Sequence, residues 1–167
     1  AAVKKDSQAE HHEELSFLYK YILPVDHKII GMQYIFTGLI MAIIGGYFSY
    51  AFRMQLAFPG EVVPLYGLVG PGEYNMLITN HGTIMIFWVA MPVLIAGFGN
   101  YLIPLMIGCD DMVFPRLNRL SYQIFLVSAL VLIASFFVTG GGFGGAWTSY
   151  PPLSSNAEYS LTDWGAS

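Results

Sequence analysis

Long apolar segments without charge divide the chain. The first runs from about residue 29 to 52, the second lies within residues 74–109, and the third runs from about 120 to 139. Each can supply the roughly 20 apolar residues that a helix needs to cross a bilayer. None shows the alternation typical of a strand, and segments of this length favour helix. The pattern predicts an all-α membrane protein with three transmembrane helices, in which Pro92 and Pro104 can kink the second.

The composition agrees with a membrane location. Charged residues make up 11% of the chain, less than half of the roughly 25% that soluble domains carry. The sequence has no basic stripe of the kind that binds nucleic acid. Cys109 is the only cysteine, which excludes an internal disulfide and a CxxC metal site within this sequence.

The 7 lysines and arginines predict the orientation in the membrane. All but Arg53 either precede the first apolar segment or lie between the second and the third. Because basic residues favour the cytoplasmic side, we expect the N-terminus inside. The 53–73 connection is rich in glycine and proline and is expected to be a structured outer loop.

The chain divides into three parts. Residues 1–25 are expected to form a polar arm and an interfacial segment, with a short helix over 15–23 at headgroup depth. Residues 26–154 contain the transmembrane helices, and residues 155–167 form an outer tail without a closing element. Three membrane helices can bury a site only against further helices. We therefore expect the chain to be an N-terminal piece or part of a larger assembly.

His81 is the most informative polar residue, because it interrupts the uncharged second segment. Hydrocarbon offers an imidazole no water, so the ring requires a partner. Neutral imidazole is a common metal ligand, and haem iron is among its targets. Gly82 beside it would let a flat group approach the backbone. A packing histidine bonded to a neighbouring carbonyl explains the ring equally well.

Further polar residues flank the apolar segments. Arg53 follows the first segment on the outer side, where its guanidinium can donate to a cofactor held by His81. Snorkelling to the interface is the favoured alternative. Amide, hydroxyl and carboxylate groups on the inner side can order a water chain for protons, although a capped, solvated turn is the simpler explanation. These inner residues are Asp110, Asp111, Asn118, Ser121 and, further along the second helix, Asn100.

Several motifs together resemble one family. They are DHKIIGMQY at 26–34, NHGTIMIFWVAMP at 80–92, GFGNYLIPLMIG at 97–108, DMVFPRLNRLS at 111–121 and WTSYPPLS at 147–154. In order and spacing they are similar to the N-terminal part of the catalytic subunit, subunit I, of haem–copper oxygen reductases of the cytochrome c oxidase type. The resemblance covers nearly everything after residue 20. It implies that the three helices belong to a larger, twelve-helix bundle.

The resemblance implies cofactor roles for residues on the outer side. His81 of the NHG motif is implied to be an axial ligand of the low-spin haem iron, with haem A as the cofactor. Arg53 is implied to hydrogen-bond the formyl group of that haem, and Trp147 to contact a propionate. A glycine usually precedes this tryptophan, whereas this chain has Ala146, whose methyl is expected to shift the packing of the loop.

The resemblance also implies a proton-uptake pathway that opens on the inner side. Its mouth is Asp111 of the DMxFPRxN motif, and not the neighbouring Asp110. The residues implied to line the pathway are Asn100, Asn118, Ser121 and Tyr34.

For the complete enzyme, the resemblance implies a proton-pumping terminal oxidase that reduces O2 to water. Electrons would come from cytochrome c through a copper-containing subunit II to the haem on His81. They would then reach a second haem and copper in the missing remainder of subunit I, and subunit III is a further expected partner. Glu73 and Met76 stand where quinol-using relatives carry histidine and glutamine, which favours cytochrome c. The expected location is a bacterial inner membrane, with the N-terminus cytoplasmic.

Two alternatives stay open. A quinol oxidase of the same superfamily would use the same helices and the same haem ligand. A non-catalytic membrane piece that assembles or stabilises a respiratory complex would use His81 only for packing. Under each interpretation this segment alone is expected to be inactive, because one histidine cannot complete a six-coordinate haem.

Overall fold

The computed structural model describes residues 23–138, 142–152 and 154–155. Most of the predicted arm, with its interfacial helix, and nearly all of the tail lie outside these residues. The described part contains three helices that are long and apolar enough to cross a membrane, which confirms the predicted all-α class. They are α1 (His27–Ala57), a long second helix from Pro71 to Ile107, and α4 (Pro115–Ser135).

The second helix has four sections. They are α2 (Pro71–Thr83), the π-helical η2 (Ile84–Ala90) and η3 (Pro92–Gly97), and α3 (Phe98–Ile107). Proline lacks an amide hydrogen and crowds the preceding turn, and the wider turns of a π-helix accommodate such an interruption. Pro92 begins η3, so the predicted irregularity at this residue takes the form of π-helix. Pro104 lies inside α3 without interrupting it.

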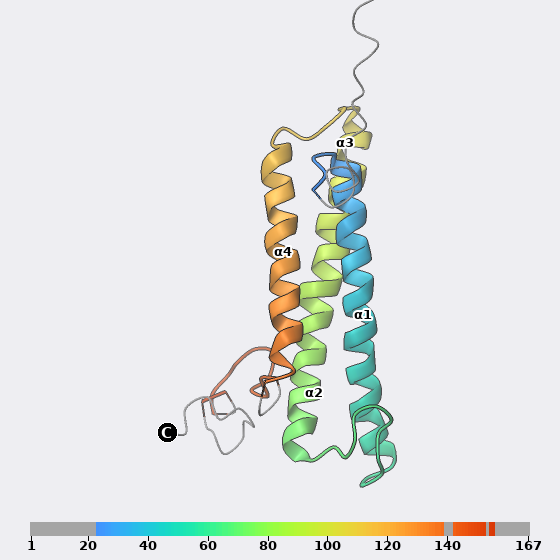
Figure 1. Ribbon diagram of the computed structural model, residues 1–167, viewed down its shortest axis with the longest axis vertical. Helices are drawn as coiled ribbons and strands as arrows, with labels where there is room; N and C mark the ends of the chain where they lie inside the picture. Colours follow the sequence, from blue (N-terminus) through green and yellow to red (C-terminus); the bar gives the residue numbers. More distant parts are fainter. Residues whose placement is uncertain (1–22, 139–141, 153, 156–167) are drawn as a thin grey trace, which may run out of the picture.

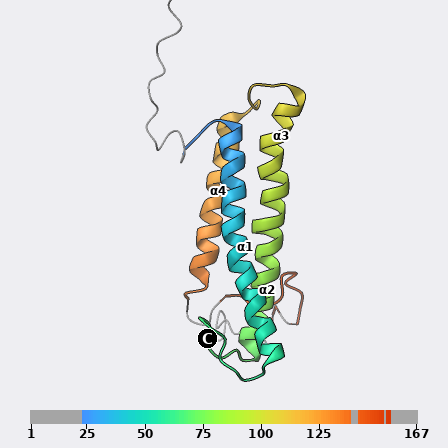
Figure 2. The same cartoon turned by 90° about the vertical axis from the view of Figure 1, so that its right-hand side faces the viewer.

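Helix α1 is the element on which the others pack. It contacts every section of the second helix and also α4, and the two views show it running beside both (Figures 1 and 2). The 58–70 connection and the segment after α4 gather at one end of the bundle, whereas the 108–114 connection lies at the other (Figure 1). Following the predicted orientation, we call these the outer and inner ends.

Residues at the helix ends explain where the helices begin and end. Asp26 caps α1, because its side chain accepts a hydrogen bond of 2.8 Å from the Lys28 amide. Pro71 and Pro115 occupy the first positions of α2 and α4, where a missing amide hydrogen leaves no bond unmade. Gly108 ends α3 in the left-handed conformation at φ 73°.

Several predicted boundaries were wrong. Helix α1 continues beyond residue 52 to Ala57, so Arg53 lies inside the helix and the outer connection is 58–70. Helix α4 begins at Pro115 and ends at Ser135, and not at 120 and 139. The prediction used the limits of the charge-free segments, but a membrane helix can continue into the polar interface, where arginine is tolerated. This explains the extension of α1 past Arg53 and the start of α4 before Arg116 and Arg119; the earlier end of α4 has no such explanation.

Glycines on one face of α1 bring it against the second helix. Gly31, Gly38 and Gly45 are buried and lie about two helical turns apart, so they share a face. A Cβ at Gly31 would lie 2.9 Å from the Gly97 carbonyl oxygen, and a Cβ at Gly38 would lie 2.4 Å from Cγ2 of Val93. Small residues let helix backbones approach where lipid gives no hydrophobic driving force. We call these three residues the glycine seam.

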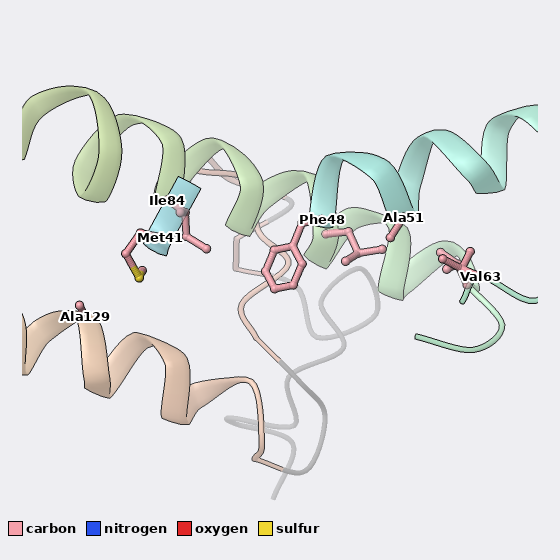
Figure 3. Close-up of a cluster of buried hydrophobic side chains, with 8 residues drawn as sticks. Met41, Phe48, Ala51, Val63, Ile84 and Ala129 are labelled. Atoms are coloured by element: carbon pink, nitrogen blue, oxygen red, sulfur yellow. The ribbon is translucent and has the colours of Figure 1, made fainter. Parts of the chain in front are cut away.

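The largest apolar cluster lies between the three helices toward the outer end. Its buried members are Met41, Phe48, Ala51, Val63, Val69, Leu77, Ile84 and Ala129, most of them labelled in Figure 3. A smaller cluster, formed by Ile30, Tyr34 and Tyr122, joins α1 to α4 nearer the inner end. Many large apolar side chains face outward, as Ile43 does with 74% of its surface exposed. Such faces suit contact with lipid or with further helices.

The glycine seam can be tested with a single methyl group. We expect Gly38→Ala to push α1 away from the second helix, because overpacking of this kind costs about 1–3 kcal/mol. The measurement is the thermal midpoint and the yield of the purified membrane complex. Gly46→Ala is the matched control, since a Cβ there would meet nothing within 4 Å among the described residues. Equal stability of the two variants would contradict the seam.

Candidate functional site

His81 lies in the last turn of α2, where its ring faces α1. Its Nδ1 atom lies 2.8 Å from the carbonyl oxygen of Gly45. The seam makes this contact possible, because a Cβ at Gly45 would lie 3.0 Å from Cγ2 of Ile84 and 3.1 Å from Sδ of Met85. A carbonyl can only accept, so Nδ1 carries the proton. In a neutral ring, Nε2 then keeps its lone pair.

The Nε2 atom of His81 has no hydrogen-bond partner in the part of the chain that the structure describes. Phe52 packs edge-on against the imidazole, with ring centroids 5.7 Å apart, and so restricts its orientation. Histidines that bind metals commonly donate their other N–H to a carbonyl, which fixes the tautomer and raises the basicity of the ligating nitrogen. The hydrogen bond to a carbonyl that is expected of a packing histidine is therefore present. It involves only Nδ1 and gives no role to Nε2.

The described residues provide a single ligand at this position. They contain no group of three or more histidine, cysteine, aspartate or glutamate side chains that could hold a metal ion. A cofactor that took His81 as a ligand would therefore bring most of its own ligand set or share His81 with another part of the protein.

Trp147 lies beside the same turn of α2. A Cβ at Gly82 would lie 3.4 Å from Cδ1 of Trp147, so the flat group that approaches this glycine is an indole of the chain itself. The ring also lies 6.5 Å from that of Phe87, measured between centroids. Trp147 is 49% exposed, and its indole N–H has no acceptor among the residues described here. The indole N–H is therefore available to an acceptor outside the described residues.

Arg53 lies on the outer part of α1, next to Phe52. It is exposed, and the ion pairs found among the described residues do not include it. The structure does not bring its guanidinium into contact with His81, although the neighbouring Phe52 does contact that ring. The guanidinium therefore stays available to an acceptor supplied by another molecule or another part of the protein.

At the inner end, four of the predicted polar residues lie among the mostly apolar residues that line one open cavity of about 600 Å³. Asn100 of α3, Asp111 of the connection, and Asn118 and Ser121 of α4 all line it, whereas Asp110 does not. Tyr34 lies next to this group, because its hydroxyl is 3.0 Å from Oγ of Ser121. The structure therefore brings together the residues that the resemblance assigned to a proton pathway.

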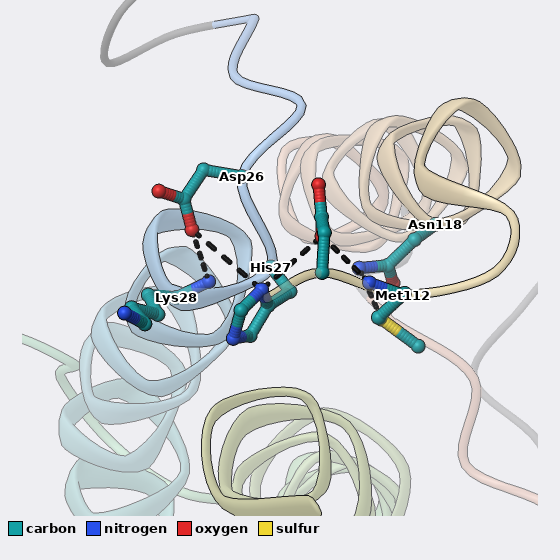
Figure 4. A network of polar contacts seen from close by, with 6 residues as sticks. Asp26, His27, Lys28, Met112 and Asn118 are labelled. Carbon is teal, nitrogen blue, oxygen red and sulfur yellow. Dashed lines mark hydrogen bonds and ion pairs between the residues drawn. The ribbon is translucent and has the colours of Figure 1, made fainter. Parts of the chain in front are cut away.

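Asp111 is held at this cavity by a contact that the sequence did not reveal. Its Oδ1 atom lies 3.1 Å from Nδ1 of His27 and accepts a 2.7 Å hydrogen bond from the Met112 amide (Figure 4). His27 is buried at the start of α1, whereas the Asp111 side chain is 43% exposed. A capped turn explains the bond to Met112, but it explains neither the cavity nor the contact with His27.

Glu73 and Met76, the positions that favoured cytochrome c over quinol, lie in the first turns of α2. Glu73 also affects the pKa of Tyr66, a residue of the 58–70 connection. Burial raises the pKa of the Tyr66 phenol above its ordinary value, and the nearby Glu73 and Tyr47 raise it further. The phenol therefore stays neutral at physiological pH.

Sequence reasoning missed several residues that position these groups. The spacing of the glycines in α1 was an available signal for Gly45. His27 stood inside a quoted motif but received no role. Thr79 and Asn80, which hold the segment carrying Trp147, gave no signal, because their partners lie more than sixty positions further along the chain.

Comparisons with known proteins identify the family of the chain. Residues 29–167 match the model of the family described as Cytochrome C and Quinol oxidase polypeptide I. The chain is 45% identical over 148 residues to Cytochrome c oxidase subunit 1 of Thermostichus vulcanus, which covers 89% of this chain and 26% of that relative. It is 39% identical over 156 residues to Alternative cytochrome c oxidase subunit 1 of Bradyrhizobium diazoefficiens, with 93% and 26% covered.

A third relative is Heme-copper oxidase subunit I+III of Aeropyrum pernix. The identity is 43% over 139 residues, which cover 83% of this chain and 16% of that relative. The chain thus spans about a quarter, 26%, of the first two relatives.

Proposed function

Because the chain belongs to the family of cytochrome c and quinol oxidase polypeptide I, we propose that it forms the haem-ligating and proton-admitting part of a terminal oxidase subunit I. His81 is the proposed axial ligand of the low-spin haem iron. The observation that carries this proposal is the state of the ring: Nδ1 lies 2.8 Å from the Gly45 carbonyl oxygen, and Nε2 has no partner among the described residues. Residues 26–154 are the proposed transmembrane part, between an arm and an outer tail.

The residues around His81 fit a haem. A bound haem would supply a one-electron redox centre, with haem A as the proposed type. His81 would hold the iron through Nε2, and the Gly45 carbonyl would keep that nitrogen basic. The Arg53 guanidinium would donate to the formyl oxygen of the haem on His81, and the indole N–H of Trp147 would donate to a haem propionate. The rest of subunit I would supply the second axial ligand, the second haem and the copper.

Replacement of His81 tests the ligand directly. We expect His81→Leu in the complete complex to abolish the low-spin haem band of the visible spectrum, because leucine offers no lone pair. His81→Met should shift the band instead, since a thioether can still bind iron. His27→Asn, which removes a histidine at the opposite end, is the control and should keep the band. An unchanged band in His81→Leu would leave only the packing role.

Cytochrome c is the proposed electron donor, with a copper-containing subunit II as the entry point for electrons and subunit III as a further partner. The support is the presence of Glu73 and Met76 where quinol-using relatives carry histidine and glutamine. A quinol donor is the alternative. We expect the purified complex to consume O2 with reduced cytochrome c and to show no response to ubiquinol or menaquinol. The opposite pattern would identify a quinol oxidase.

Asp111 is the proposed point of proton entry. Its Oδ1 accepts from His27 and Met112, which leaves Oδ2 to exchange protons with water. The carboxylate lies at the cavity that Asn100 and Asn118 also line, and polar side chains of this kind can hold bridging water. The pair of Tyr34 and Ser121 would continue the path toward the middle of the bundle.

The two adjacent aspartates provide a matched test of proton entry. We expect Asp111→Asn to slow O2 reduction by roughly 10- to 100-fold and to abolish pumping, because an amide cannot exchange a proton in this way. Asp110→Asn should leave both unchanged, since Asp110 does not line the cavity. The measurements are O2 consumption and proton ejection by vesicles containing the complex. Full pumping by Asp111→Asn would remove the assignment.

A bacterial inner membrane is the proposed location of this multi-pass protein, with a cytoplasmic N-terminus. The distribution of lysine and arginine supports this orientation, because all but Arg53 would then face the cytoplasm. Asp111 would face the side from which protons are taken, and His81 and Trp147 would lie near the opposite face, where the electron donor docks.

A further inference from the structure

Two polar side chains that have received no role so far meet between α1 and α4. Oγ1 of Thr37 lies 2.9 Å from the hydroxyl oxygen of Tyr122. Thr37 is 8% exposed and Tyr122 is 7% exposed, and both belong to helices that can cross a membrane. A hydroxyl in such a position requires a partner, because hydrocarbon offers none. The two side chains supply that partner to each other.

The neighbouring residues make the reverse contact. Tyr34 lies one turn before Thr37 on α1, and its hydroxyl oxygen is 3.0 Å from Oγ of Ser121, the residue before Tyr122 on α4. Each helix thus contributes one tyrosine, which reaches a shorter hydroxyl side chain of the other helix. The two phenol rings pack edge-on, with centroids 5.1 Å apart and planes at 79°. We call these two contacts the hydroxyl pairs.

The direction of one hydrogen bond follows from its neighbour. Oγ of Ser121 donates to the Asn118 carbonyl at 2.7 Å. A serine hydroxyl has a single hydrogen, so Tyr34 is the donor in the bond to Ser121. The donors therefore form a chain that begins on α1 and ends at Asn118, a residue that lines the inner cavity.

The hydroxyl pairs act on the position of α4 along α1. Among the described helical elements, α4 packs chiefly on α1. Apolar contacts between helices have no preferred direction, whereas hydrogen bonds depend on distance and angle. Asn118 and Ser121 lie within one turn of Tyr122. The position at which Tyr122 is held on α1 therefore decides whether these two residues line the cavity.

We propose that Thr37 and Tyr122 are positioning residues, which hold α4 at the register where Ser121 and Asn118 line the proton-entry cavity. The inference rests on the proposed function for the role of that cavity. The contact itself is a property of this chain. Its effect on helix packing can therefore be measured without any assumption about protons.

A double-mutant cycle in the complete complex tests the contact. We expect Thr37→Val and Tyr122→Phe each to lower the thermal midpoint, because each removes the same hydrogen bond and leaves one hydroxyl unpaired. The variant that carries both substitutions should be no less stable than the weaker single variant. Thr37→Ser keeps the hydroxyl and should stay near the native midpoint. Additive losses would overturn the contact, since the two side chains would then act independently.

The second measurement is the rate of proton uptake per haem. We expect Thr37→Val and Tyr122→Phe to slow proton uptake and O2 reduction by about threefold, the factor by which a typical interhelical hydrogen bond in a membrane biases an equilibrium. The KM for the electron donor and the low-spin haem band should stay native, because His81 contacts α1 about two helical turns further out. Thr37→Ser should restore the native rate.

Ser128→Ala is the matched control on α4. The Ser128 hydroxyl donates to the Phe125 carbonyl of its own helix, so its loss removes a hydroxyl without removing a hydroxyl pair. We expect native proton uptake in this variant. An equal slowing in Ser128→Ala and Tyr122→Phe would overturn the specific role of Tyr122.

The outcomes separate this inference from the proposal on which it rests. A lowered, non-additive midpoint with native proton uptake would overturn the positioning role and leave a packing contact. In an Asp111→Asn background, Tyr122→Phe should slow turnover no further, because both act on one path. Full pumping by Asp111→Asn would remove the proton-entry role of the cavity, while the double-mutant cycle would still decide whether the contact holds α4.

Discussion

The close approach of α1 to the second helix is the constraint on which the rest of the structure depends. In lipid, helices associate through backbone proximity and hydrogen bonds, because there is no water to drive apolar surfaces together. Gly31 and Gly38 provide that proximity along the inner part of the contact. At its outer part, the carbonyl oxygen of Gly45 accepts a hydrogen bond from Nδ1 of His81. The packing of the helices and the tautomer of the imidazole therefore have one physical origin.

The second helix also separates the two polar regions. From His81 to Asn100 it covers nineteen positions, which correspond to roughly 28 Å at a rise of about 1.5 Å per residue. Phe52 and Gly45 contact His81 in the outer region, whereas the buried His27 and the cavity define the inner one. Each region is assembled from at least two helices. A shift of α1 would therefore disturb both the contact of His81 with Gly45 and the contact of His27 with Asp111.

The sequence predicted the fold class and the membrane helices, because hydropathy over twenty or more residues depends little on tertiary context. It misjudged the last residues of α1 and the first residues of α4, where interfacial arginines are compatible with helix. The motif resemblance assigned Asn100, Asn118 and Ser121 to one pathway, and in the structure all three line one cavity. It could not supply the acceptor of His81 or the partner of Asp111. Those contacts join residues 36 and 84 positions apart, and only the packing of the helices decides them.

Ala146 shows how a local departure from a family pattern is absorbed. A methyl in place of the usual glycine was expected to shift the packing of the loop. Ala146 adopts φ 65°, in the region that favours glycine, and the backbone amide of the same residue is bonded to Thr79. Since L-residues resist this conformation, the hydrogen bond to a buried hydroxyl offsets part of the strain. The bond to Thr79 therefore attaches the loop to α2 at the residue directly before Trp147.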